Sequence, residues 1–151
     1  MTSVLLVCAA NLCRSPMAEV VFRARAPLLG LQQIASAGVW AASRPQPMDP
    51  RAVAALQRRG YKPERRWHSR RVQPLDFSRY ELVLAMDQEV LDGLHKSRPA
   101  HCAAELGLFL GGRFASPPQE VPDPYYGSAL GFDRVLDLIE ARSSHWLQHG
   151  P

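Results

Sequence analysis

The sequence has little of what marks secreted or membrane proteins. Its three cysteines are too few, and odd in number, for the disulfide framework of a small extracellular protein. No apolar run approaches the roughly 20 residues that a membrane-spanning helix needs. The apolar stretch Val4–Ala10 has no basic lead-in, so a signal peptide is not expected either. These absences favour a cytoplasmic protein with reduced cysteines and no membrane insertion.

Length and composition are those of an ordinary globular protein. Of the 151 residues, 46% are hydrophobic and 21% are charged, which excludes a disordered or collagen-like chain. A chain of this length can bury one sizeable core without disulfides. We therefore expect a single domain over residues 1–151.

The positive charge is concentrated in one segment. The whole chain has a formal net charge of +4, but residues 51–71 hold eight arginines and lysines against the single acidic residue Glu64. A basic segment can bind nucleic acid or another anionic partner. The basic residues of this segment are not interleaved with an aromatic platform for stacking on bases. We therefore interpret the segment as a solvated surface and do not expect nucleic-acid binding.

Short apolar runs alternate with amphipathic stretches along the chain. Helices are predicted in the C-terminal stretch around Phe132–Trp146 and at Pro16–Arg25, Pro50–Arg59 and Gln88–His95. Strands are predicted at Ser3–Val7, Gln33–Ser36, Glu81–Met86 and Leu106–Leu110. Wholly apolar strands that alternate with helices predict an α/β fold, with a parallel sheet covered on both faces. Ligands of such sheets bind beyond the carboxyl ends of the strands.

The segment after the first predicted strand has the composition of an anion-binding loop. Ser15 suits the N-cap of the following helix and Pro16 its first position. Small side chains let backbone N–H groups curl around an anion, and the helix N-terminus adds its dipole. Arg14 can bind two phosphate oxygens at once. The predicted phosphate-binding loop comprises Ala9, Ala10, Asn11, Leu12, Cys13 and Ser15.

Cys8, at the end of the strand, is predicted to be a nucleophile. The positive surroundings that bind phosphate also favour a thiolate over a thiol. A thiolate beneath the phosphorus atom of a bound ester can attack it, and the Ser15 hydroxyl can donate a hydrogen bond to the sulfur. The alternative is that Cys8 is only a small buried residue that ends a strand.

Cys13 has two interpretations. It is either an ordinary loop residue, or a redox partner that forms a reversible disulfide with Cys8 and protects it from irreversible oxidation. Cys102 lies far away in the sequence among alanines, and we interpret it as an ordinary core or surface thiol.

A second group of candidate residues lies near residue 123. A departing alcohol needs a proton donor. Asp123 stands between two prolines, which hold it on a rigid loop, and Tyr125 and Tyr126 offer aromatic walls for a flat substrate. The alternative is an ordinary turn before the last helix.

Together these motifs resemble the low-molecular-weight protein tyrosine phosphatase family, in its bacterial form, over almost the whole chain. The matching segments are Val7–Pro16, Ser36–Gly38, Asp49–Ala52, Asp76–Tyr80, Leu82–Asp87 and Asp123–Gly127. The resemblance implies a three-layer fold with a central four-stranded parallel sheet and the phosphate-binding loop after its first strand. It also implies hydrolysis in two steps without a metal or other cofactor.

The resemblance further implies a role for individual residues. Cys8 attacks phosphorus to give a phosphocysteine intermediate, and Arg14 binds the phosphate and stabilises the transition state. Asp123 protonates the leaving phenol and then activates the hydrolytic water. The residues that hold the loop in its strained shape are Asn11, Ser15 and Ser36.

One departure from the family pattern concerns the support of the loop. The family completes that network with a histidine before an Ala-Arg pair. The register from Arg70 and Asp76 places Trp67 at this position, and His68 follows one residue later. Either the loop shifts by one residue or the network is altered.

A second departure concerns the substrate pocket. The family's usual bulky residue falls on Ala42, and Trp40 lies two residues earlier. Either Trp40 swings in as a wall of the pocket, beside Tyr125 and Tyr126, or the pocket is more open. Leu12 presents an apolar flank to an aromatic ring, which favours phosphotyrosine over a guanidinium phosphate.

Three other functions compete with this interpretation. An arsenate reductase on the same fold needs a relay of further cysteines, and only Cys102 is left for it. A phosphoarginine phosphatase and a phosphate-binding module without activity are the others. The expected partner is a phosphotyrosine protein, and bacterial members of the family suggest a tyrosine autokinase that controls polysaccharide export. The expected oligomeric state is a monomer or a weak dimer.

Overall fold

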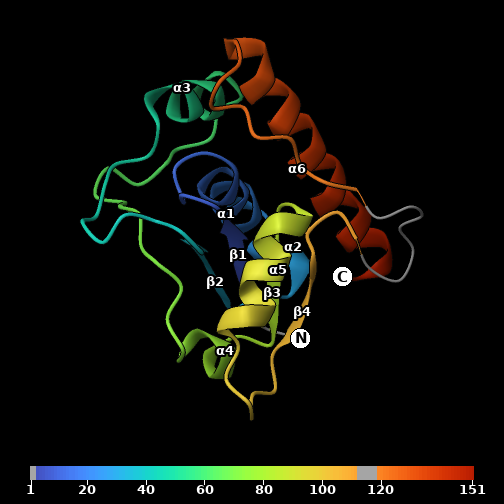
Figure 1. The fold of residues 1–151 in the computed structure, drawn as a ribbon. Coiled ribbons are helices and arrows are strands. Elements are labelled where there is room, and N and C mark those ends of the chain that lie inside the picture. The colour runs from blue at the N-terminus through green and yellow to red at the C-terminus, as the bar shows by residue number, and fades with distance from the viewer. Residues whose placement is uncertain (1–2, 112–118) are drawn as a thin grey trace.

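The computed structural model describes residues 3–111 and 119–151, and its strands form one parallel sheet. The strands are β1 (Ser3–Cys8), β2 (Gln33–Gly38), β3 (Leu82–Ala85) and β4 (Glu105–Leu108), in the order β2-β1-β3-β4. Leu5 of β1 lies opposite Ala35 on one side and Val83 on the other. Because β1 is an inner strand, hydrogen bonds hold both of its edges, and its end is a fixed point for the loop that follows (Figure 1).

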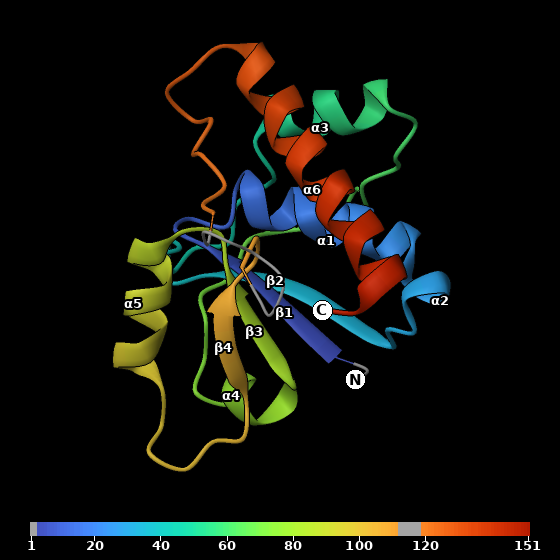
Figure 2. The same cartoon turned by 90° about the vertical axis from the view of Figure 1, so that its right-hand side faces the viewer.

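Helices cover both faces of the sheet (Figure 2). One face carries α1 (Arg14–Ala24), α2 (Ala26–Leu29), α3 (Pro50–Arg58) and α6 (Ala129–His149), and the other carries α4 (Asp76–Arg79) and α5 (Gln88–Ser97). The predicted three-layer α/β fold is therefore confirmed. The sequence did not predict α2 and α4, because a helix of four residues is too short to show a periodic pattern.

Successive residues of β1 pack into opposite layers, because the side chains of a strand point alternately to its two faces. Val4 and Leu6 belong to the core under α1 and α6. Leu5 and Val7 belong to the core under α4 and α5. All four side chains are fully buried, and burial of each Leu or Val stabilises the fold by about 1.5–3 kcal/mol. The wholly apolar run therefore reflects two-sided burial.

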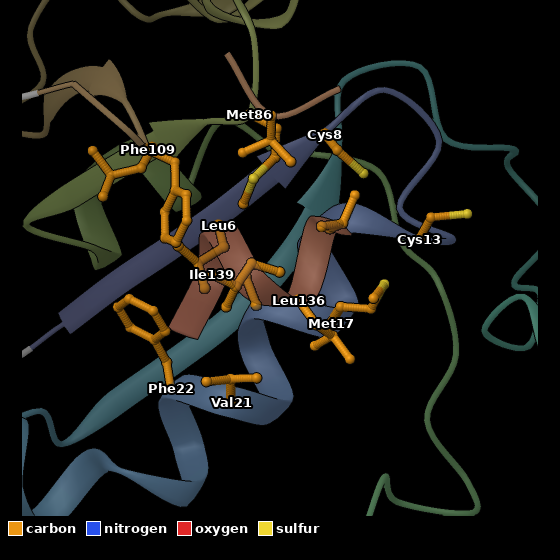
Figure 3. Packing of buried hydrophobic residues seen from close by; sticks show 14 of the residues in the cluster. Leu6, Cys8, Cys13, Met17, Val21, Phe22, Met86, Phe109, Leu136 and Ile139 are labelled. Atoms are coloured by element: carbon orange, nitrogen blue, oxygen red, sulfur yellow. The ribbon is translucent and has the colours of Figure 1, made fainter. Parts of the chain in front are cut away.

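Aromatic rings fill the core under α1 and α6. The ring centroids of Phe22 and Phe109 lie 5.5 Å apart, and Trp146 meets Phe22 edge-on at 5.2 Å. Figure 3 shows Phe22 of α1 and Phe109, which follows β4, near Leu6 of β1 and Ile139 of α6. This packing joins α1 and α6 to the sheet, so the first turn of α1 is held close to the end of β1.

Acidic side chains of α6 neutralise part of the basic segment 51–71. Arg59 pairs with Asp137 at 2.8 Å and also with Glu140, and Arg58 pairs with Asp133 at 3.3 Å. These ion pairs join the end of α3 to α6 and are in keeping with the interpretation of the segment as a solvated surface. Within residues 3–111 and 119–151, no helix has the length and apolar character to cross a membrane.

Candidate active site

The chain between β1 and α1 forms a tight loop at the carboxyl end of the sheet. Asn11 has a φ of 59°, a left-handed conformation that asparagine adopts more readily than most residues. The loop lies close against the end of β2, where Val39 N donates to Cys8 O at 3.0 Å. Gly38 permits this approach, since a Cβ there would lie 2.7 Å from Ala9 O.

The first turn of α1 differs from the prediction. The helix begins at Arg14, and Cys13 occupies the cap position without a side-chain hydrogen bond to the helix. The assignment of Ser15 to the N-cap is therefore wrong. The Ser15 hydroxyl is instead directed toward the loop, where it lies 3.0 Å from Cys8 Sγ.

Buried side chains form a hydrogen-bonded network behind the loop. Asn11 Nδ2 donates to Ser15 Oγ at 2.8 Å and to Ser36 Oγ at 3.1 Å. Ser36 Oγ donates in turn to Oε1 of Glu19 at 2.6 Å. Because Ser15 Oγ accepts from Asn11, its own proton can be donated to the sulfur of Cys8. The structure thus brings together the three residues expected to hold the loop, and adds Glu19 to them.

Arg14 is buried and bound on two sides. Its Nη1 donates to Asp87 Oδ2 at 2.7 Å and to the carbonyl oxygen of Val121 at 2.9 Å, and its Nη2 lies 3.9 Å from Asp123. Burial by itself would lower the pKa of Arg14, but Cys8, Asp87 and Asp123 raise it above its ordinary value. Arg14 is therefore a fixed cation beside Cys8.

Asp87 is a site residue that the sequence interpretation did not single out. Its Oδ1 accepts from Val90 N at 2.8 Å, so it caps α5, while Oδ2 holds Arg14. Asp87 follows β3 at the same edge of the sheet at which the loop follows β1. Its place after an apolar strand was the available signal, because residues at the carboxyl ends of parallel strands meet.

A cavity of about 350 Å³ opens above the loop. Cys8 is only 3% exposed, whereas Tyr126 is 91% exposed, so the sulfur lies deep and the tyrosine lies at the mouth. Figure 3 shows Cys8 at the end of β1, at the edge of the core. The lining residues are Cys8, Ala9, Ala10, Leu12, Cys13, Arg14, Asp123, Tyr125 and Tyr126.

Asp123 stands on the wall of this cavity. Its side chain is about half exposed, at 49%, and Oδ1 accepts from the backbone N–H of Tyr125 at 3.0 Å. The rings of Tyr125 and Tyr126 meet edge-on, with centroids 4.9 Å apart. A carboxyl group, a cation and a thiol therefore face one space with aromatic rings at its entrance, which suits the transfer of an oxyanion group from an aromatic ester.

Trp40 lies outside the set of residues that line the cavity in the described part of the chain. It is 51% exposed, and its ring lies against α5, where a Cβ added at Gly93 would be 3.2 Å from Cζ2 of Trp40. In this structure Trp40 is therefore placed against α5, and its role as a pocket wall stays a prediction.

Cys13 lines the same cavity as Cys8, but its surroundings are different. Its thiol lies 3.8 Å from Asp49 Oδ2. Burial, and then the negative charge of Asp49, raise the pKa of Cys13 to about 12. Cys13 is therefore a neutral thiol at neutral pH. Cys102 precedes β4 and so lies at the amino end of the sheet, at the opposite edge from the loop.

The described residues contain no group of three or more His, Cys, Asp or Glu side chains arranged to hold a metal ion. The chemistry that these residues can supply is that of a thiol nucleophile, a guanidinium clamp and a carboxyl group that exchanges a proton.

Comparisons with known proteins agree with this geometry. A low-molecular-weight protein-tyrosine-phosphatase of Streptomyces coelicolor is 39% identical over 144 residues, covering 91% of this chain and 87% of the relative. A low-molecular-weight phosphotyrosine phosphatase crystal structure from Vibrio cholerae superposes with a TM-score of 0.83 at 35% identity, over the whole of both chains. The crystal structure of a Drosophila arginine phosphatase has a TM-score of 0.84 at 25% identity, covering 98% of this chain and 97% of that one.

Residues 3–149 match the family described as low molecular weight phosphotyrosine protein phosphatase. The fold, the loop after β1 and the extent of this match lead to one conclusion: the chain belongs to the low-molecular-weight phosphotyrosine protein phosphatase family.

Proposed function

We propose that this chain hydrolyses phosphotyrosine in proteins through a phosphocysteine intermediate on Cys8. One observation carries the proposal: Cys8 lies deep in a cavity whose lining also includes Arg14 and Asp123 and whose mouth carries two tyrosine rings. A nucleophile, an anion clamp and a proton donor thus face the same bound group.

In the first step the thiolate of Cys8 attacks the phosphorus atom. The S–P bond forms as the bond from phosphorus to the phenolic oxygen breaks, and Asp123 delivers its proton to that oxygen. The backbone N–H groups of the loop and the guanidinium of Arg14 stabilise the charge on the equatorial oxygens. The hydrogen bond from Ser15 to the sulfur keeps the thiolate in place.

In the second step water attacks the phosphorus atom of the phosphocysteine. Its proton passes to the Asp123 carboxylate, the S–P bond breaks, and inorganic phosphate and the Cys8 thiolate are released. Asp123 suits both roles because it is half exposed and lies close to the clamp, 3.9 Å from Nη2 of Arg14. The carboxyl group can therefore meet both the leaving phenol and the incoming water.

The depth of the cavity supports phosphotyrosine as the substrate. Because the sulfur of Cys8 is buried, a phosphate carried on a phenyl ring is better suited to reach it than one carried on the shorter serine side chain. Leu12 in the lining offers apolar contact to that ring. A phosphoarginine substrate would leave guanidinium N–H groups against Leu12, which costs about 1–3 kcal/mol for each donor left without a partner.

Phosphoarginine is nevertheless the second candidate, because a Drosophila arginine phosphatase shares the fold over 98% of this chain. An arsenate reductase is less well supported. Its cysteine relay would have to use Cys102, and that thiol lies beyond the opposite edge of the sheet, at least one strand length of about 13 Å away.

The partner and the location stay predictions. A tyrosine autokinase of polysaccharide export as the natural substrate rests on the family resemblance. A cytoplasmic location is supported by the free thiols of Cys8, Cys13 and Cys102, which are typical of a reducing compartment.

The test is phosphate release from peptides that differ only in carrying phosphotyrosine, phosphoserine or phosphoarginine, assayed without added metal. We expect release from the phosphotyrosine peptide alone, and its loss in the Cys8→Ser variant, which should still bind phosphate. Faster release from the phosphoarginine peptide would favour the second candidate. Release by Cys8→Ser would remove the assignment of the nucleophile.

A further inference from the structure

Trp67 reaches the network behind the phosphate loop. Its indole Nε1 donates to Oε1 of Glu19 at 3.3 Å, the same oxygen that accepts from Ser36 at 2.6 Å. Arg23, one turn further along α1, holds the other oxygen of Glu19 at 3.1 Å. The side chain of Glu19 is only 8% exposed, and both of its carboxylate oxygens have partners. Trp67 thus takes the position predicted from the register of Arg70 and Asp76. The network differs from the family pattern because this position holds a tryptophan and not a histidine.

A continuous path of hydrogen bonds runs from Trp67 to the nucleophile. From Glu19 it passes through Ser36, Asn11 and Ser15 to the sulfur of Cys8, with donor–acceptor distances of 2.6–3.1 Å after the first step. Asn11 is the residue in the left-handed conformation, so its side-chain partners keep the backbone of the loop in that shape.

We infer that Trp67 is a positioning residue for the phosphate loop, acting through Glu19 and Ser36 on Asn11. This inference rests on the proposed function for its effect on turnover, but its effect on phosphate binding does not depend on that function. Loss of the indole N–H leaves Ser36 and Arg23 as the partners of the carboxylate. Glu19 can then turn toward Arg23, and Ser36 loses its fixed acceptor.

An indole donates the same hydrogen bond at every pH at which the protein is folded. The charged and titratable groups around it are Glu19 and Arg23 on α1 and those of its own loop, which are Tyr61, Lys62, Glu64, Arg65, Arg66 and His68. His68 directs its Nδ1 to the carbonyl oxygen of Ser69 at 3.3 Å. The donor at position 67 thus adds no ionisation of its own to the support of the loop.

Trp67 and Tyr61 line a second cavity, of about 330 Å³, which is separate from the one above the loop. The test compares Trp67→Phe with Tyr61→Phe as a control from this second cavity. The hydroxyl of Tyr61 donates to Glu140 of α6 at 2.6 Å, so Tyr61→Phe removes a polar donor without touching the network. Affinity for inorganic phosphate is measured by NMR titration of backbone amides, and kcat and KM with p-nitrophenyl phosphate. We expect Trp67→Phe to weaken phosphate binding and lower kcat/KM by about five- to tenfold, as for the loss of one ordinary hydrogen bond, since the donor lies at the long distance of 3.3 Å.

Two further variants separate positioning from packing. Ser36→Ala should cost a similar factor, and the double variant Trp67→Phe/Ser36→Ala should lose little more than the worse single variant, because both residues act on the same path. Trp67→His restores a ring N–H and should recover part of the lost phosphate affinity. It should also add to the pH profile of kcat/KM an ionisation that the wild-type protein lacks.

Three results would overturn the inference: phosphate affinity within twofold of wild type in Trp67→Phe, an equal loss in Tyr61→Phe, or full additivity with Ser36→Ala. A lower melting temperature alone, with unchanged phosphate affinity, would mean that Trp67 only packs. If the wild-type protein did not hydrolyse phosphotyrosine but Trp67→Phe still weakened phosphate binding, the proposed function would fail and the positioning role would stand.

Discussion

Replacement of Asp49 by Asn should speed the closure of a disulfide between Cys13 and oxidised Cys8. Peroxide converts the Cys8 thiolate to a sulfenic acid and is itself reduced to water. The Cys13 thiolate then attacks that sulfur, and the hydroxyl group leaves as water after taking a proton. Only ionised Cys13 reacts, so the pKa of Cys13 limits the rate.

The size of the effect follows from the surroundings of Cys13. With its pKa raised to about 12 by burial and then by Asp49, only about one molecule in 10⁵ carries the thiolate at neutral pH. Asn keeps the cap of α3 but removes the charge beside the sulfur. If this lowers the pKa of Cys13 by about one unit, the thiolate is tenfold more abundant but about threefold less nucleophilic. We therefore expect closure to be about threefold faster.

The assay separates closure from the first oxidation. A Cys102→Ser protein is exposed briefly to peroxide, catalase removes the excess, and the linked Cys8–Cys13 peptide is followed by mass spectrometry after quenching with a thiol reagent. The rate at which the Cys8–Cys13 disulfide closes should rise about tenfold for each pH unit between about pH 7 and 9, because the pKa of Cys13 lies above that range.

A second variant serves as an internal control, because it should change the rate of disulfide closure in the opposite direction. Arg51 lowers the pKa of Cys13 and is held by Asp49, so Arg51→Gln should slow closure while Asp49→Asn speeds it. Equal rates in the two variants, or a rate independent of pH, would refute the reasoning. Formation of a Cys8 sulfonate without a linked peptide would mean that Cys13 does not protect Cys8.

Three further predictions concern the clamp, the acid and the fold. Asp87→Asn should lower kcat/KM for p-nitrophenyl phosphate about tenfold or more, because Arg14 loses a charge-assisted hydrogen bond of about 1.5–3 kcal/mol; a change below twofold would contradict this. Asp123→Asn should slow hydrolysis of phenyl phosphate more than that of esters with very acidic phenols, which need little protonation, and equal slowing would remove its role as the acid. Arg59→Gln should lower the free energy of unfolding by about 1 kcal/mol or less, since its ion pairs with α6 are partly exposed, and leave kcat/KM unchanged; chemical denaturation and the phosphatase assay check both.

The sheet and the long helices could be predicted because each has a periodic or continuous apolar signal. β1 reads as an unbroken apolar run since it is buried on both faces, and its predicted start at Ser3 agrees with the structure. Boundaries were less accurate, as at α1, which starts two residues before Pro16. There the backbone of the tight loop after β1 placed Cys13 at the cap, and the preference of Ser15 for the N-cap was overridden.

The candidate site also has one part that the sequence could show and one part that only the fold brings in. Residues 8–15 are contiguous, so a motif can show them together. Glu19 and Asp87 join the loop only through the fold, one from the next turn of α1 and one from the end of a neighbouring strand. Asp87 could be noticed by its place after an apolar strand, but Glu19 has no such sign, because its partner Ser36 comes from another element. The spacing of Glu19 and Arg23 by one helical turn was the only local sign of such a pair.

Two of the three tryptophans, Trp40 and Trp67, show where side-chain direction has to come from the fold. Trp40 and Trp67 both lie in stretches without regular periodicity, so neither spacing nor hydropathy says which of them faces the site. The direction of the Trp40 side chain depends on Gly93 of α5, against which its ring lies. A glycine inside a helix costs about 1 kcal/mol relative to alanine, and here a Cβ would lie 2.9 Å from Val39 Cγ1 and 3.2 Å from Trp40. The absence of that side chain leaves room for the indole against α5, and Trp40 is not among the residues that line the cavity in the described part of the chain.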